Sequence, residues 1–437
     1  MMATLATAAL VPVAIFLSLF FFYLISRHPA LSAISAAVVV SIAWEVPNIP
    51  PLAALAGFQV YFLDLLTVGL LVLTLARTSQ MIRNIGFTAW IWLGLGAILF
   101  FAFARGASTI GLPEATSEFR AYLYPFASLG WAFSLDWDRP GTDKLVRRFA
   151  LAIGYSLSLV AFYHISLHGL GSTSEFVSVN ADTEQTSRAL VAGQALMLLL
   201  STIVCLHFWK STGKRSYAWS AGLFTLVIIL TQERTVWVAA AGAAIAVGLS
   251  GNTGVKRRTA LVVASAAFFA FIAIASGALS PVIDTLVGAA QNFNTIEARM
   301  EGWTNLIRGS TLQGMPVVLF GEPFGQGYGR AQSGVWVTYA PHNWYLSLYL
   351  RSGIVGLILF TSFLIVVATR ALRAHAPAAS IAIVVVMIAF GWTYSWPWYV
   401  FVFIGWAIVP LTNRARIQDS LEVPIMTPQN VKGGTIA

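Results

Sequence analysis

The residues best placed to do chemistry are a histidine and an asparagine that stand side by side. His342 and Asn343 follow Pro341 in the run APHNWYLSLYL, one short amphipathic stretch before a long apolar one. An imidazole accepts a proton near neutral pH better than any other side chain. We therefore predict that His342 is a general base and that Asn343 supports it. The alternative is a histidine that caps a helix or is buried and hydrogen-bonded.

An arginine and a tryptophan further upstream share a helical spacing. Arg299 and Trp303 stand four residues apart in IEARMEGWTNLI, so both project from one face of a short helix. A guanidinium beside an aromatic ring suits a sugar or a lipid headgroup. The alternative is an amphipathic helix that lies on the membrane surface with its charges in water.

A charged pair stands at the junction of two apolar segments. Glu233 and Arg234 occur in TQERTVW, residues 231–237, at the depth of a membrane interface. Ionisable residues at that depth are functional candidates by default. We predict that Arg234 binds an anionic group and that Glu233 supports it. The alternative is a turn in which the two charges satisfy each other.

Other polar signals point to structure. The run GEPFGQGYG, residues 321–329, lacks the lysine and the flanking strand of a phosphate loop, so we expect a tight turn that folds back over the site. Asp64 lies inside an apolar segment, where we expect it to hydrogen-bond a neighbouring helix. The other histidines lack metal-ligand spacing, and no paired carboxylates occur. We therefore expect neither a metal nor a cofactor.

The composition is that of a membrane protein. Hydrophobic residues make up 58% of the 437 residues, charged residues 10%, and the mean hydropathy is +0.77. The net charge of +9 could suggest nucleic acid. The basic residues, however, lie in short clusters between apolar runs, which is the pattern of cytoplasmic membrane loops, so we expect no nucleic-acid partner. A single cysteine, Cys205, excludes an intramolecular disulfide.

Apolar runs long enough to cross a bilayer predict an all-α, polytopic fold of about 12 or 13 transmembrane helices. The predicted spans lie near residues 5–26, 30–46, 56–76, 85–104, 120–136, 149–167, 189–209, 217–232, 235–250, 259–280, 353–370, 379–395 and 397–412. The implied organisation is transmembrane helices over 1–280, an extracytoplasmic loop with short helices and the site residues over 281–352, further transmembrane helices over 353–412, and a disordered cytoplasmic tail over 413–437.

Basic clusters in alternate gaps, such as Lys144 with Arg147 and Lys210 with Lys214, assign those gaps to the cytoplasm. The remaining basic residues are all arginines on the opposite side, where each needs a reason. They either reach the interface and pair with nearby glutamates or line a basic cavity suited to a diphosphate. They are Arg105, Arg120, Arg188, Arg234, Arg299, Arg308, Arg330 and Arg351.

These features together resemble the O-antigen ligase and O-antigen polymerase superfamily of bacterial lipid-linked glycan enzymes. The resemblance is carried by ERTVW at a span junction, ARMEGW at the start of a long loop, LFGEPFGQGYG, and PHNWYLSLYLRSGIVGL running into the next span. It covers roughly residues 230–370. The first half of the chain is similar in hydropathy alone.

The resemblance implies a polytopic bacterial inner-membrane enzyme whose periplasmic loop caps the active site, without a metal or a nucleotide sugar. It makes Arg234, Arg299 and Arg120 candidate diphosphate ligands and His342 the candidate base. Asn343, Trp303, Glu233 and Arg188 are predicted to support them. The implied partners are the bilayer, a polyprenyl (undecaprenyl) diphosphate-linked oligosaccharide donor, and a glycan or lipid A-core acceptor.

The predicted activity is inverting glycosyl transfer on the extracytoplasmic face. We favour a polymerase of surface polysaccharide or O-antigen, because PHNWYL is similar to the exopolysaccharide group. The alternative is an O-antigen ligase that joins the polymer to lipid A-core. A hypothesis of another class is a transporter or flippase for the same lipid-linked glycan, although no repeated halves are evident.

Overall fold

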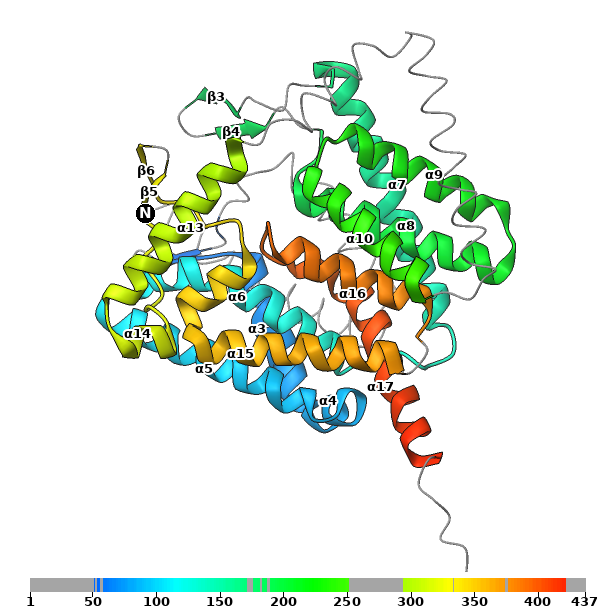
Figure 1. The fold of residues 1–437 in the computed structure, drawn as a ribbon, viewed down its shortest axis with the longest axis horizontal. Coiled ribbons are helices and arrows are strands. Elements are labelled where there is room, and N and C mark those ends of the chain that lie inside the picture. Colours follow the sequence, from blue (N-terminus) through cyan, green and yellow to red (C-terminus); the bar gives the residue numbers. More distant parts are fainter. Residues whose placement is uncertain are drawn as a thin grey trace, which may run out of the picture.

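The computed structural model describes residue 51 and residues 53–55, 58–170, 176–180, 183–186, 189–250, 294–332, 334–373 and 376–421. Within these ranges the chain is mostly helical, as predicted (Figure 1). Three antiparallel hairpins are the exceptions to the all-α prediction. They are β1 (Ala53–Leu55) with β2 (Phe58–Val60), β3 (Phe176–Asn180) with β4 (Thr183–Thr186), and β5 (Arg330–Gln332) with β6 (Val335–Val337).

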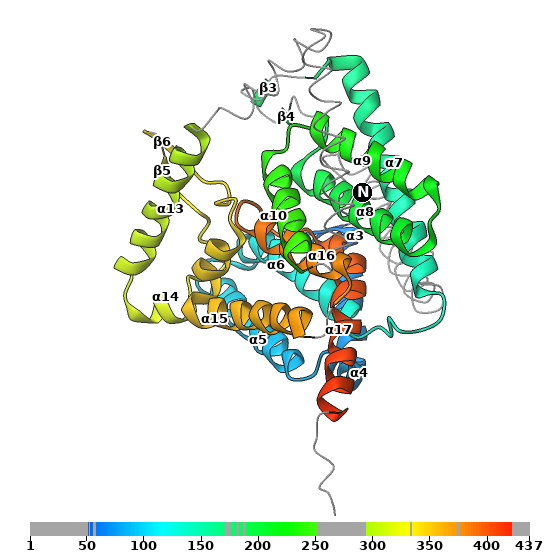
Figure 2. The ribbon, with the colours of Figure 1, turned by 45° about the vertical axis from the view of Figure 1, so that its right-hand side comes forward.

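The helices form two groups joined by the C-terminal pair. The first group holds α3 (Phe62–Ala76), α4 (Thr78–Ile85), α5 (Thr88–Thr109), α6 (Leu112–Phe133) and α15 (Trp344–Arg373). The second group holds α7 (Thr142–His168), α8 (Ala192–Thr212), α9 (Arg215–Leu230) and α10 (Arg234–Ser250). The joining elements are α16 (Ala378–Gly391), the short turn η1 (Trp398–Val400) and α17 (Phe401–Leu421), with α16 against α10 and α17 against α6 (Figures 1 and 2).

Four of the described helices are long and apolar enough to cross a membrane, namely α5, α7, α8 and α15. The α3–α4 pair, bent by 73°, adds up to one more, and α9, α10, α16 and the stretch Trp398–Leu411 are shorter apolar helices. The chain is therefore a multi-pass membrane protein.

Every predicted span that falls on described residues overlaps a helix, but the span 120–136 overlaps α6, which is not among the helices just named, and residues 58–60 of the span 56–76 form β2. The spans at 5–26, 30–46 and 259–280 lie outside the described residues, so the total of 12 or 13 stays a prediction. Two details were wrong. Residues 78–85 form the helix α4 where we expected a loop, and α17 continues to Leu421, past the predicted end at residue 412.

The predicted cytoplasmic residues meet at the same ends of neighbouring helices. Arg370 near the end of α15 donates a hydrogen bond of 2.9 Å to the Ile85 carbonyl oxygen at the end of α4. Arg147, near the start of α7, lies over the rings of Phe208 and Tyr217, which belong to the end of α8 and the start of α9. The predicted extracytoplasmic elements lie at the other end of α15 (Figure 1).

Those elements are α13 (Asn294–Leu312) and α14 (Met315–Phe320), which pack on the first turns of α15. A kink at Gly353, with φ of 63°, breaks α15 there. The backbone of Leu319 lies against Gly353, and the Glu322 N–H donates to the Leu350 carbonyl oxygen at 2.6 Å. A side chain at Gly353 would clash with that backbone. The kink thus fixes α14 against the helix that follows His342, and it falls where the predicted span 353–370 begins.

Candidate active site

A buried arginine at the centre of this end holds three segments together. Arg351 is fully buried and forms ion pairs with Glu118 of α6 and with Glu322, the latter at 2.8 Å. Its guanidinium also donates to the Gly327 carbonyl oxygen and lies 4.5 Å from the centre of the Tyr328 ring. Two carboxylates thus neutralise this buried charge. Arg351 is a structural residue, and its inclusion in a basic cavity was wrong.

The glycine-rich loop binds a carboxylate of its own chain. Glu118 accepts hydrogen bonds from the Gly325 N–H at 2.8 Å and from the Gly327 N–H at 3.4 Å. Gly325 has φ of 95°, a conformation that favours glycine. The predicted tight turn is confirmed, and its backbone donors point at Glu118.

His342 lies between two tyrosine rings, directly before α15. Its ring centre is 5.5 Å from that of Tyr339 and 5.5 Å from that of Tyr394. The backbone at His342 is left-handed, with φ of 49°. Among the described residues only His342 and Gln232, in the Arg234 motif, combine a positive φ with a side chain, and such strain gathers at functional sites.

The two residues beside His342 are held by other groups. The Asn343 side-chain oxygen accepts the Leu346 N–H at 3.0 Å and so caps α15. Trp303 of α13 donates its indole N–H to the Pro341 carbonyl oxygen at 2.7 Å. The predicted capping role therefore belongs to Asn343, and Trp303 fixes α13 next to the histidine.

Two arginines lie close to this imidazole. Arg299 stacks on Tyr394, with its guanidinium 5.7 Å from the ring centre. Arg330 is buried, lies over Tyr339, and donates to the Tyr328 and Tyr339 carbonyl oxygens at 3.0 and 2.8 Å. Burial first, then the charges of Arg299 and Arg330, lower the pKa of His342 to about 4. The imidazole is therefore neutral at pH 7 and free to accept a proton.

Arg234 is the first residue of α10, a helix that packs on α16. A Cβ added to Gly242 would lie 3.6 Å from Val385, and Ala246, one turn later, packs on a cluster that includes Ile381. Residue numbers thus rise along α10 as they fall along α16, so the two helices are antiparallel. The role of Arg234 at the site stays a prediction. Glu233 is 2% exposed at the same turn.

The other far-side arginines differ in their surroundings. Arg120 binds both oxygens of Asp64 at 2.8 Å, which confirms the predicted inter-helix hydrogen bonding of Asp64. Arg105 donates to the carbonyl oxygens of Phe320 and Gly321 at the end of α14, so it too is structural. Arg308 is exposed, and Arg188 lies outside the described residues. A basic cavity lined by all eight arginines is therefore wrong, whereas Arg299 and Arg330 do gather at His342.

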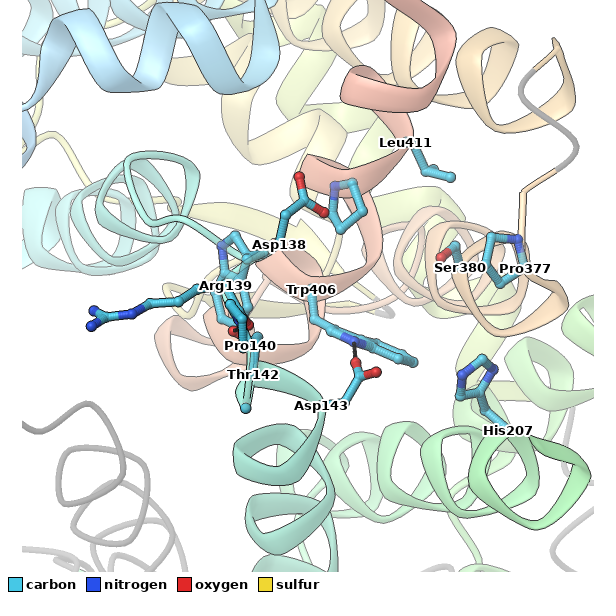
Figure 3. Close-up of a pocket in the computed structure, with 13 residues that line it drawn as sticks. Asp138, Arg139, Pro140, Thr142, Asp143, His207, Pro377, Ser380, Trp406 and Leu411 are labelled. Atoms are coloured by element: carbon cyan, nitrogen blue, oxygen red, sulfur yellow. Dashed lines mark hydrogen bonds between the residues drawn. The ribbon is translucent and has the colours of Figure 1, made fainter. Parts of the chain in front are cut away.

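A separate cavity of about 300 Å³ lies at the opposite end, among the predicted cytoplasmic turns. Figure 3 shows the indole N–H of Trp406 donating to Asp143, at 3.0 Å, with His207 nearby. The His207 ring contacts Phe208 and Trp406 edge-on. No predicted site residue lines this cavity. Among the described residues, no cluster of three or more potential metal ligands occurs.

A comparison with protein families matches the segment that carries most of the predicted site residues. Residues 219–361 match the family described as O-antigen ligase (Wzy_C). This part of the chain is therefore an O-antigen ligase family domain, as the resemblance predicted. The match begins in α9 and ends in α15, so it includes Arg234, Arg299, Trp303 and His342. No curated protein matches the chain.

The alternative that a far-side arginine pairs with a nearby glutamate is confirmed for Arg351 and Glu118, whereas the sequence gave no special role to Arg330. Which arginine Glu118 would meet was not predictable, because its contacts lie more than 200 residues away. Arg330 was one arginine among eight. Its position after GEPFGQGYG and before the PHN segment was the available signal, since both of its carbonyl partners flank the β5–β6 hairpin.

Proposed function

We propose that the chain transfers glycan from a polyprenyl diphosphate carrier to an acceptor hydroxyl, at the site around His342. The observation that carries this proposal is a neutral, half-buried imidazole with two arginines beside it. A neutral imidazole can take a proton, while guanidinium groups bind a diphosphate through paired hydrogen bonds. The family match supports the same class of reaction.

In the proposed step, the imidazole of His342 removes the proton of the acceptor hydroxyl as its oxygen attacks C1 of the donor sugar. The bond between C1 and the diphosphate oxygen breaks, and the diphosphate leaves with the electron pair. Attack from the face opposite the leaving group inverts the configuration at C1. Arg299 and Arg234 would stabilise the charge that develops on the leaving oxygen, in a site where water screens it little.

We place this site on the periplasmic side of the bacterial inner membrane, because the basic clusters lie at the opposite ends of the helices. The acceptor decides the finer class. We propose a polymerase, in which the acceptor is a second lipid-linked glycan. A ligase would use lipid A-core at the same site, so product analysis with each acceptor separates the two.

The test is a His342→Ala variant in purified protein, with the lipid-linked oligosaccharide isolated from cells that lack this protein. We expect transfer to fall by roughly 10² to 10⁴-fold, the usual contribution of a general base. Donor binding should persist, because the arginines remain. An Arg308→Ala variant, changed on the exposed face of α13, is the control and should keep its activity. Near-normal turnover of His342→Ala would falsify the assignment of the base.

A further inference from the structure

A hollow lies beside the site, at the N-terminal ends of α3 and α6. Its volume is about 520 Å³, and the glycine-rich loop forms one wall. The residues that matter for its chemistry are Tyr61, Glu114, Ser117, Arg120, Tyr328 and Thr338. This hollow is called the α3–α6 groove below.

The α3–α6 groove and His342 are built on one segment. Thr338 lines the groove, and the next residue, Tyr339, lies against the His342 ring. Arg330 holds the carbonyl oxygens of Tyr328 and Tyr339 together, so a groove residue and a neighbour of His342 share one buried anchor. The groove is therefore lined by the same segment that carries His342.

The groove and the surroundings of His342 differ in charge, because the cations that act on His342, Arg299 and Arg330, do not line the groove. Inside the groove, Arg120 is paired with Asp64, and Glu118 is paired with Arg351 and binds the glycine N–H groups. The groove also presents an exposed carboxylate, Glu114, together with hydroxyl and phenol groups. Carboxylates repel a diphosphate and accept hydrogen bonds from sugar hydroxyls. Arg299, which suits the diphosphate, stacks instead on Tyr394 at the other contact of the imidazole.

Aromatic side chains stand near the same wall. Trp336 of the β5–β6 hairpin is 69% exposed and Tyr339 is 48% exposed, although both are large rings that are usually covered. Aromatic faces with a few well-placed polar groups are typical of small-ligand sites. We propose that the α3–α6 groove binds the oligosaccharide of the acceptor and orients its hydroxyl toward His342. This inference rests on the proposed function.

The single native cysteine, Cys205, is buried, so an introduced thiol can be labelled selectively. The probe is the lipid-free oligosaccharide released by mild acid from the lipid-linked donor of the producing cells. A Ser117→Cys variant reports on the groove. A Ser108→Cys variant reports on the exposed end of α5, which does not line the groove. At ten times its dissociation constant, the oligosaccharide should slow maleimide labelling at position 117 about tenfold and leave position 108 unchanged.

Equal labelling with and without oligosaccharide, or equal slowing at both positions, overturns the proposal. Protection of position 117 by inorganic pyrophosphate alone also overturns it, because the groove would then be an anion site. The labelling does not require turnover, so it can be repeated in the His342→Ala background. Protection of position 117 in the His342→Ala variant, together with full transfer activity, would contradict the role of His342 as the base and still support oligosaccharide binding in the groove. With the lipid-free oligosaccharide as acceptor and the lipid-linked glycan as donor, a Ser117→Trp variant should raise the KM for the acceptor and leave the KM for the donor unchanged.

Discussion

At the scale of single residues, the low proton affinity of His342 needs an explanation. A general base works best when its pKa lies near the operating pH, yet burial and two arginines hold the pKa of this imidazole at about 4. A bound diphosphate carries negative charge and would offset the two cations. Donor binding would therefore raise the pKa of His342 and make it a stronger base only when the leaving group is in place.

If donor binding raises the pKa of His342, the pH profiles of kcat/KM and of kcat should fall off at different acidic pH values. The pH profile of kcat/KM reports the free enzyme, so its limb should lie near pH 4, whereas the limb of kcat reports the complex and should lie at higher pH. Steady-state rates across the acid range would show this. An Arg299→Gln variant loses one cause of the low pKa, so its kcat/KM limb should move toward pH 6.5. Identical limbs that no arginine substitution moves would contradict the account.

A second residue-scale prediction concerns the geometry of anion binding. Lysine keeps the charge of Arg234 but loses the planar fork that binds two oxygens at once. We expect Arg234→Lys to lower donor affinity and transfer by at least tenfold while the protein still inserts normally. Arg308→Lys, on the exposed side of α13, is the matched control and should be close to wild type. Equal activity of both variants would leave Arg234 without a role in diphosphate binding.

Single residues were predictable only where the local pattern decides the outcome. The spacing of Arg299 and Trp303 places them on one helix face, and α13 contains both. Burial, in contrast, depends on partners far along the chain. Arg351 and Arg330 look alike in sequence, yet Arg351 meets two carboxylates that neutralise it, while Arg330 meets backbone carbonyl oxygens and remains a net charge near His342.

At the scale of elements, the α14–α15 junction depends on the ion pairs of Arg351. Leaving one charge of a buried pair uncompensated costs about 3–5 kcal/mol, and removing Glu118 should cost less because Glu322 remains as a partner of Arg351. Glu118→Gln should therefore lower the unfolding midpoint of the purified protein and increase proteolysis within residues 321–329. Glu297→Gln, on an exposed position of α13, is the control and should change neither. Unchanged proteolysis of Glu118→Gln would mean that the loop is held by other contacts.

The elements also show where sequence reasoning works. Apolar length located a helix at every predicted span on described residues, and the break at Gly353 coincided with the start of the predicted span 353–370. Helix α4 was missed because Arg77 and Arg83 suggest a loop, whereas its buried Met81 and Ile85 form an apolar face that only packing reveals. The hairpins are short, and their strands carry no periodic signal that distinguishes them from loops.

At the scale of the whole molecule, the polar chemistry divides between two ends. The predicted cytoplasmic end carries exposed basic residues near helix ends, such as Lys144, Lys210 and Lys214, while Arg147 and Arg370 at the same end are half-buried. At the end that holds His342, Arg299, Arg330 and Arg351 are bound to carboxylates, carbonyl oxygens or aromatic rings, and Arg308 is exposed. Basic side chains in water near helix ends are what the cytoplasmic side of a membrane protein displays. Arginines that are bound to partners inside the protein do not indicate which side is cytoplasmic.

The proposed orientation rests on these basic residues and can be tested on the intact membrane. Ser108 at the end of α5 and Ser216 at the start of α9 are both exposed serines, one at each end of the molecule. In spheroplasts, a membrane-impermeant maleimide should label a Ser108→Cys variant, and it should label a Ser216→Cys variant only after the membrane is opened with detergent. Cys205 is buried and gives the background in the unmodified protein. The reverse pattern would place His342 in the cytoplasm, where a glycan carried on the outer leaflet could not reach it.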